Sequence, residues 1–166
     1  VVYDVNASLR RAISLTLEDN TVFSNNDRAI AICDTRIAIG DNAIFSGNRD
    51  DTEKDGGGAI WCRNGGIIIG DNALFSGNYV DMDSRDSWGG VFLDDMGGST
   101  ITVGENAIFI GNYVSSNSGC ATGGVMWVRK YGLYDNVKDT GAISMGANAT
   151  FINNYAFSDS GNAFGG

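Results

Sequence analysis

Few residues of this chain combine the types and the spacing that catalysis requires. Histidine is absent, so a Ser-His-Asp or Cys-His arrangement is excluded, and no glycine-rich phosphate loop with a lysine occurs. The remaining enzyme class is a polysaccharide lyase or hydrolase, which works with carboxylates and a cation in a groove. Its candidates are Asp94-Asp95 and Arg129-Lys130, and the alternative is that these four are polar turn residues. Because the sequence displays no groove, we predict no catalytic residue and no cofactor.

The three cysteines, Cys33, Cys62 and Cys120, show no zinc-binding spacing, and the usual nitrogen ligand, histidine, is missing. Cys33 and Cys62 occupy nearly the same place in successive copies of a repeat, one residue out of phase. The two thiols therefore either form a disulfide or remain two small buried side chains.

Acidic residues recur at one position of the same repeat. Like charges one copy apart repel each other, so a bound Ca²⁺ would relieve them, and the alternative is a row of solvated carboxylates screened by salt. The column comprises Asp19, Asp41, Asp71 and Glu105, of which Asp41, Asp71 and Glu105 are the weak calcium candidates. Residues 49–55 and 81–88 are also rich in acids, but they lack EF-hand spacing and are interpreted as variable surface loops.

The element that must position these residues is a repeat, seen most clearly in residues 67–78, I-I-I-G-D-N-A-L-F-S-G-N. Ungapped copies occupy residues 15–26, 37–48, 101–112 and 143–154. The first and third positions are always large and apolar, whereas the second varies, and this period of two predicts a strand with one buried face. A search for internal repeats therefore decides the fold class.

Three positions of the repeat are invariant. Phenylalanine at the ninth position is expected to stack inside the core, and asparagine at the sixth and twelfth, with glycine at the fourth in four copies, marks corners where the backbone turns left-handed. Stacked asparagine side chains can hydrogen-bond along the stack, and we expect Asn42, Asn72 and Asn106 to form an inward ladder. The columns are Phe23, Phe45, Phe75, Phe109 and Phe151; Asn20, Asn42, Asn72, Asn106 and Asn148; and Asn26, Asn48, Asn78, Asn112 and Asn154.

The spacing of the copies predicts the architecture. The phenylalanines are separated by 22, 30, 34 and 42 residues, and the growth is assigned to one corner, between the second asparagine and a second motif at Gly57–Ile60, Gly89–Phe92 and Gly123–Met126. We predict an all-β chain: a parallel, right-handed β-helix of about five to six three-strand coils with loops at one corner. Residues 1–14 form a partial preceding coil or cap. Residues 15–166 form the repeats, expected to be an excerpt of a longer solenoid because a new Gly-Gly begins at Gly165.

The pairing of F-x-x-N with G-G-A-I resembles the chlamydial polymorphic outer-membrane proteins and similar bacterial autotransporter passengers. F-x-x-N stands at each invariant phenylalanine, and G-G-A-I stands unaltered at Gly57–Ile60. The linking I-G-D-N segment is not part of that family signature, and nothing in the chain resembles the family's C-terminal membrane barrel. The resemblance covers roughly residues 15–166 and implies a surface-exposed β-helical passenger with adhesive roles.

Charge limits the possible partners. The net charge of −9 and the pI of about 4.2 argue against nucleic acid, and no apolar run is long enough to cross a bilayer. We expect an extracellular or bacterial cell-surface location, with a host-cell protein or glycan, or a second copy stacked end to end, as the partner. The function hypotheses are an adhesive binding segment and, as the alternative, a structural stalk or self-assembling fibre.

The strand that follows Gly-Gly provides the binding candidates. Its column Ile30, Ile60, Phe92 and Met126 is assigned inward, so the neighbouring column points outward as an aromatic stripe for a partner. The opposite phase, with this second column in the core, and burial of the column beneath the insertion loops are the alternatives. The candidates are Trp61, Leu93, Trp127 and Trp88.

Overall fold

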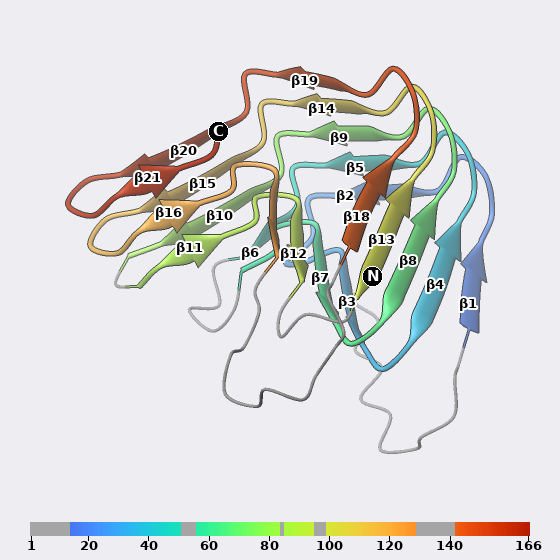
Figure 1. The fold of residues 1–166 in the computed structure, drawn as a ribbon, viewed down its shortest axis with the longest axis horizontal. Helices are drawn as coiled ribbons and strands as arrows, with labels where there is room; N and C mark the ends of the chain where they lie inside the picture. The colour runs from blue at the N-terminus through green and yellow to red at the C-terminus, as the bar shows by residue number, and fades with distance from the viewer. Residues whose placement is uncertain (1–13, 51–55, 84, 95–98, 129–141) are drawn as a thin grey trace.

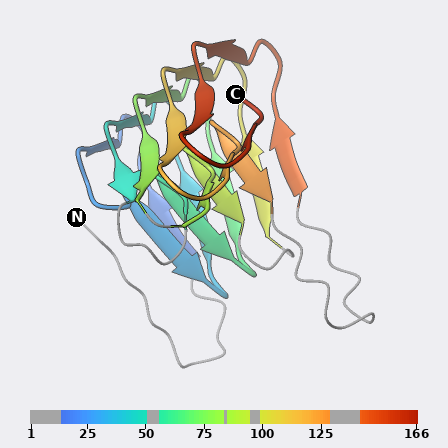
Figure 2. The same ribbon diagram turned by 90° about the vertical axis from the view of Figure 1, so that its left-hand side faces the viewer.

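The computed structural model describes residues 14–50, 56–83, 85–94, 99–128 and 142–166. Within these ranges the regular elements are all β-strands, and each paired strand lies parallel to its neighbour one coil away. The coils stack in chain order, with blue strands at one end of the stack and red strands at the other (Figures 1 and 2). The predicted parallel β-helix is therefore confirmed.

Three sheets enclose the core (Figure 1). Sheet I contains β1 (Ser14–Leu17), β4 (Arg36–Ile39), β8 (Gly66–Ile69), β13 (Thr100–Val103) and β18 (Ala142–Met145). Sheet II contains β2 (Val22–Ser24), β5 (Ile44–Ser46), β9 (Leu74–Ser76), β14 (Ile108–Ile110) and β19 (Thr150–Ile152). Sheet III contains β3 (Ile30–Cys33), β7 (Ile60–Arg63), β12 (Phe92–Asp94) and β17 (Met126–Val128).

The invariant phenylalanines form a stack along the axis of the core, as predicted. Phe45, Phe75 and Phe109 are fully buried, with ring centroids 5.0 Å and 4.7 Å apart and nearly parallel planes. Phe23 and Phe151 continue the stack at its two ends. The register follows from the sequence, because each β-strand of sheet II pairs phenylalanine with phenylalanine.

The corner between sheets I and II corrects one prediction about glycine. The sixth-position asparagines adopt left-handed φ values, for example 57° at Asn42 and 59° at Asn72, as predicted. The fourth-position glycines do not have a left-handed φ. Gly40 is needed for space, because a Cβ there would lie 2.2 Å from Oδ1 of Asp19 in the coil below.

Two asparagine ladders run along the stack, and only one of them faces inward. The sixth-position ladder forms, with Asn72 Nδ2 donating to Asn42 Oδ1 at 3.2 Å, but its side chains are exposed, so the predicted inward direction is wrong. The twelfth-position ladder is buried: Asn48 Nδ2 donates to Asn78 Oδ1 at 2.8 Å, and Asn78 Nδ2 donates to the Phe45 carbonyl at 2.9 Å. The sign of φ separates the two columns, since asparagine φ is left-handed only in the exposed one.

The insertions after the second asparagine fold into strands and not only loops. They form sheet IV, with β6 (Arg49–Asp50), β10 (Tyr79–Met82), β15 (Tyr113–Ser116) and β20 (Tyr155–Ser158), and sheet V, with β11 (Ser87–Trp88), β16 (Ala121–Thr122) and β21 (Ala163–Phe164). These sheets project from one side of the helix (Figure 1). A small second core packs between them: Val80, Met82, Val114, Ala121 and Ala156.

The number of residues between successive strands also increases at a second corner, so the prediction that all insertions lie at one corner was incomplete. Between sheets III and I, β3 ends at Cys33 and β4 begins at Arg36, whereas β17 ends at Val128 and β18 begins at Ala142. Gly165 has φ of 67°, close to the 60° of Gly89 and the 74° of Gly123. Residues 1–13 of the segment predicted to be a partial preceding coil or cap lie outside the described residues.

Candidate functional site

The outward column of sheet III is less exposed than an aromatic stripe would be. Ile30, Ile60 and Phe92 are buried in the main core, which confirms the predicted phase. In the neighbouring column Leu93 is buried as well, at 1% exposure, and Trp61 and Trp127 are half-buried. Leu93 is therefore not an accessible binding residue, and burial of this column outside the main core is the alternative that fits.

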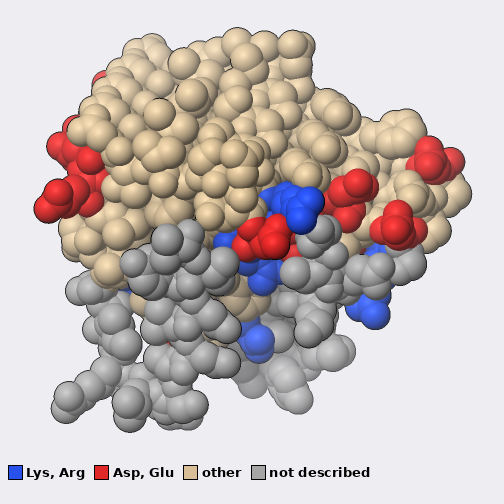
Figure 3. Space-filling model, turned by 180° about the vertical axis from the view of Figure 1, so that it is seen from behind, with Lys and Arg blue, Asp and Glu red and all other residues tan. Residues whose placement is uncertain are grey.

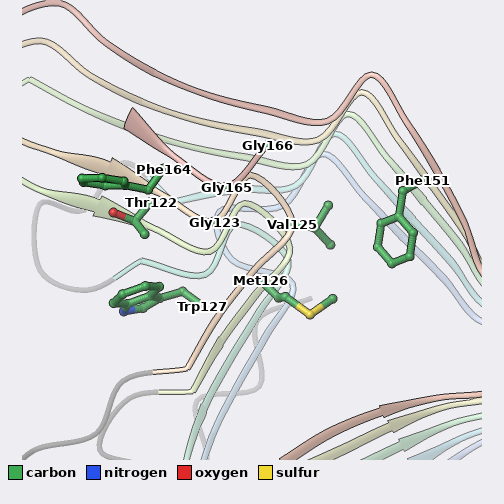
Figure 4. A pocket seen from close by; sticks show the side chains of 9 residues that line it. All are labelled: Thr122, Gly123, Val125, Met126, Trp127, Phe151, Phe164, Gly165 and Gly166. Carbon is green, nitrogen blue, oxygen red and sulfur yellow. The ribbon is translucent and has the colours of Figure 1, made fainter. Parts of the chain in front are cut away.

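Trp127 borders a hollow of about 430 Å³ at the C-terminal end of the stack, which is the upper end in Figure 1. Thr122 of β16 and Phe164 of β21 lie on the same side of this hollow as Trp127, and Phe151 lies across it (Figure 4). Trp88 of β11 pairs in register with Thr122, which pairs with Phe164. The indole nitrogen of Trp127 is buried without a hydrogen-bond partner among the described atoms. Sheet III and sheet V thus bring the predicted Trp127 and Trp88 to one side of the molecule, where Phe164 joins them.

The outer face of sheet II is uncharged and mainly aliphatic, with serine and threonine hydroxyls among the aliphatic side chains, and it was not singled out from the sequence. Val22 is 59% exposed and Ile108 and Ile152 are each 41% exposed, whereas the chain as a whole has a net charge of −9. The outward residues are Val22, Ile44, Leu74, Ile108 and Thr150 in one column and Ser24, Ser46, Ser76, Ile110 and Ile152 in the other. In Figure 3 the charged side chains gather along the left margin, in the middle and at the right, beside a broad tan area above. The sequence pattern that could have predicted this face was present, because the outward positions stand directly before and after the invariant phenylalanine of each copy.

The acidic column has a structural role at the corner between sheets I and II. Oδ1 of Asp41 accepts the backbone N–H of Asp71 at 2.8 Å, and Oδ1 of Asp71 accepts that of Glu105 at 2.8 Å. Each carboxylate therefore binds an amide of the next coil, while its side chain stays exposed to water. Groups of three or more side chains able to hold a metal ion do not occur in the part of the chain that the structure describes.

Sheet IV carries a second aromatic stack on its outer face. The rings of Tyr79, Tyr113 and Tyr155 lie parallel, with centroids 4.9 Å and 5.1 Å apart. Burial raises the pKa of the Tyr113 hydroxyl, and the neighbouring tyrosines add to the rise. These tyrosines directly follow the second asparagine of the repeat, where the sequence predicted that the inserted loops begin, and the parallel strand register aligns their rings.

The cysteines are free thiols, so the disulfide alternative is wrong. Cys62 pairs in register with Ile32, and Cys33 pairs with Arg63, so the two thiols are one residue out of phase, as the spacing indicated. Burial raises the pKa of the Cys62 thiol to about 11 and, to a smaller extent, that of Cys33. Cys62 is therefore a neutral core side chain at physiological pH.

The catalytic candidates are not assembled within the described residues. Asp94 is buried at the end of β12, with 1% of its surface exposed. Asp95, Arg129 and Lys130 lie outside the described ranges. A second buried carboxylate, Asp50, pairs with Arg28, and the guanidinium of Arg28 lies 5.7 Å from the centroid of the Trp61 ring.

Comparison with family models, with curated proteins and with solved structures finds no match to this chain. In the described residues there is no helix long and apolar enough to cross a membrane.

Proposed function

We propose that this chain is a segment of an extracellular β-helical surface protein that acts as an adhesive, passenger-type binding scaffold. The observation that carries the proposal is the exposed apolar face of sheet II on a chain with a net charge of −9. Large exposed apolar patches mark interaction sites, because a chain gains nothing by leaving them in water. The F-x-x-N and G-G-A-I motifs, shared with bacterial passenger proteins, support the same location.

The ladders make this face rigid before any partner arrives. The phenylalanine stack and the buried asparagines fix β5, β9 and β14 from the inside, so their outward side chains keep constant positions. A preformed face loses little conformational entropy on binding. The partner is a host-cell protein or glycan that presents an apolar surface.

A lysine placed on the face tests the proposal. We expect Ile108→Lys to reduce the adhesion of protein-coated beads to cultured epithelial cells by roughly tenfold or more, because a charge must be desolvated at the interface. Ser118→Lys, which adds the same charge on an exposed turn of the sheet IV and V projection, is the matched control and should bind as the unmodified chain does. Equal adhesion of the two variants would reject sheet II as the binding face.

The upper end of the stack favours one alternative, a self-assembling fibre. Phe151 and Phe157 are more than half exposed there, and β17, β18 and β19 are the last strands of sheets III, I and II. Strand edges next to an apolar core pair with any available strand, and head-to-tail pairing of copies gives an open filament.

Sedimentation separates this alternative from the monomeric scaffold. If copies stack, we expect the mean mass to rise over a hundredfold range of protein concentration, and to rise further with added salt, because screening weakens the repulsion between chains of −9 charge. A constant monomer mass at both low and high salt would eliminate the fibre.

A further inference from the structure

The outer face of sheet I contains a groove of about 660 Å³. Its lining crosses β1, β4, β8 and β13, and one column runs from Arg36 through Gly66 to Thr100, which are paired in register. The second column runs through Ala38, Ile68 and Thr102. The described residues that line the groove lie on a different sheet from the outer face of sheet II.

Gly66 creates this groove without a conformational reason to be glycine. Its φ is not in the left-handed region, and a Cβ built there would lie 3.4 Å from Cγ of Arg36 and 3.8 Å from the Thr100 carbonyl oxygen, which are ordinary contacts. Gly40 and Gly70, in contrast, would each bring a Cβ within 2.2 Å of a carboxylate oxygen. A glycine inside a strand weakens the sheet, and it often marks the close approach of a ligand. A side chain at position 66 would fit beside Arg36, so neither packing nor backbone conformation requires glycine there.

The groove combines one cation with hydroxyl and aliphatic groups. Arg36 is exposed at its edge, and the two ion pairs found among the described residues do not involve it. Thr16, Thr100 and Thr102 supply hydroxyls, and Ile68, 59% exposed, supplies an aliphatic surface. At the rim, the carboxylate of Asp34 accepts a hydrogen bond from Asn64 Nδ2.

We propose that this groove binds an oligosaccharide that carries a single acidic group. The guanidinium of Arg36 binds the acid through charge-assisted hydrogen bonds, which are about twice as strong as neutral ones. The threonine hydroxyls exchange hydrogen bonds with sugar hydroxyls, and the C–H face of a pyranose ring lies against Ile68 over Gly66. A polyanion is disfavoured, because the groove offers one cation beside Asp34 on a chain of −9 charge.

Titration with three defined sugars tests the ligand class. The probes are 3′-sialyllactose, with one carboxylate; lactose, its neutral part; and tetragalacturonate, with four carboxylates, each followed by NMR shifts of the backbone amides of β4, β8 and β13. We expect 3′-sialyllactose to bind roughly tenfold or more tightly than either of the others, which is the discrimination that one charge-assisted pair provides. Arg36→Gln should abolish this preference.

The decisive variant is Gly66→Val, which fills the groove with a side chain that suits a β-strand. We expect it to remove sugar binding while the thermal midpoint stays the same or rises, because valine favours strands and glycine does not. Ser118→Lys, on the exposed turn of the sheet IV and V projection, is the control, and it should leave sugar binding unchanged. The groove lies on sheet I and the adhesion experiment alters sheet II, so failure of one experiment and failure of the other are independent.

Several results would overturn the inference. They are the absence of saturable binding at millimolar sugar, equal affinity for lactose and 3′-sialyllactose, and unchanged binding by Gly66→Val. Binding of tetraglutamate in preference to every sugar would also overturn it, since the groove would then recognise an acidic peptide.

Discussion

Replacing Phe75 with alanine is expected to lower the free energy of unfolding by about 3 to 5 kcal/mol, the range for truncating a buried aromatic side chain. Phe75 has no exposed surface, and its ring stacks on Phe45 at 5.0 Å and on Phe109 at 4.7 Å. It also meets the edge of Phe92 at 5.1 Å and 65°. The substitution therefore leaves a cavity lined by three rings from three other strands and two sheets, so the site cannot collapse easily.

Phe151 provides the matched control, because it occupies the same column at the open end of the stack. It is 51% exposed and stacks only on Phe109, at 4.8 Å. We expect Phe151→Ala to lower stability by roughly 1 kcal/mol, in proportion to the smaller area buried. Chemical denaturation measures both variants. A loss below about 1 kcal/mol for Phe75→Ala, outside the range for core truncation, would reject the register of the phenylalanine column.

The second large effect is expected from Asn78→Asp, which keeps the shape of the side chain and removes its donors. Asn78 Nδ2 donates to the Phe45 carbonyl at 2.9 Å and to Asn112 Oδ1 at 2.9 Å, and the residue is fully buried. A carboxylate would place an acceptor against both of these acceptors without a counter-ion. We expect a loss of about 3 to 5 kcal/mol at pH 7, as for other uncompensated buried charges.

Asn72→Asp is the control for this change, because Asn72 belongs to the exposed ladder. Its loss should be roughly 1 kcal/mol or less, since water solvates the new charge. Burial raises the pKa of the carboxyl introduced by Asn78→Asp, so this variant is least destabilised below the unfolded pKa of about 3.9 and loses stability as the pH rises through its folded pKa. Denaturation curves at pH 4 and pH 7 measure this difference. Equal losses at the two positions, independent of pH, would show that the ladders are assigned wrongly.

The fold was predictable because one physical rule dominates it. Positions one, three and nine of the repeat bury large apolar side chains, and a stack of short parallel strands is the arrangement that satisfies this pattern in every copy. Phe45, Phe75 and Phe109 could thus be placed in one column before the structure was known. Unequal spacing between copies then required that length changes lie at corners, although the strand bounds put them at two corners and not one.

The direction of the asparagine ladders was not predictable from residue type. Asn72 and Asn78 both stand at invariant positions, each after a small or acidic residue. Asn72 itself adopts the left-handed backbone conformation at its corner. At the other corner Gly77 adopts that conformation, with φ of 60°, and Asn78 follows it. A residue that makes the turn points its side chain to water, and the residue after the turn begins the next segment facing inward. The prediction for glycine at position four was wrong for a related reason. At Gly40 the close approach of the Asp19 side chain requires glycine, and a left-handed backbone conformation does not.

The binding surfaces were only partly predictable. The sequence predicted correctly that Trp61 and Leu93 point away from the main core. Whether other parts of the chain cover such a side chain, as they do at Leu93, depends on tertiary structure. The exposed face of sheet II and the groove at Gly66 depend on neighbours that are 22 to 42 residues apart along the chain, as the intervals between the phenylalanines show. Reading each column across all copies, on both sides of the strand, would have found the first of these.

Hydrogen exchange of the side-chain amides, followed by NMR, tests most directly that the coils stack with one buried and one exposed asparagine ladder. The structure predicts slow exchange for the Nδ2 hydrogens of Asn48, Asn78 and Asn112, which are fully buried and bonded to two acceptors each. Exchange at Asn42, Asn72 and Asn106 should be faster by roughly tenfold or more, because water reaches these groups without global opening. Similar, fast exchange in both columns would contradict the stacked arrangement.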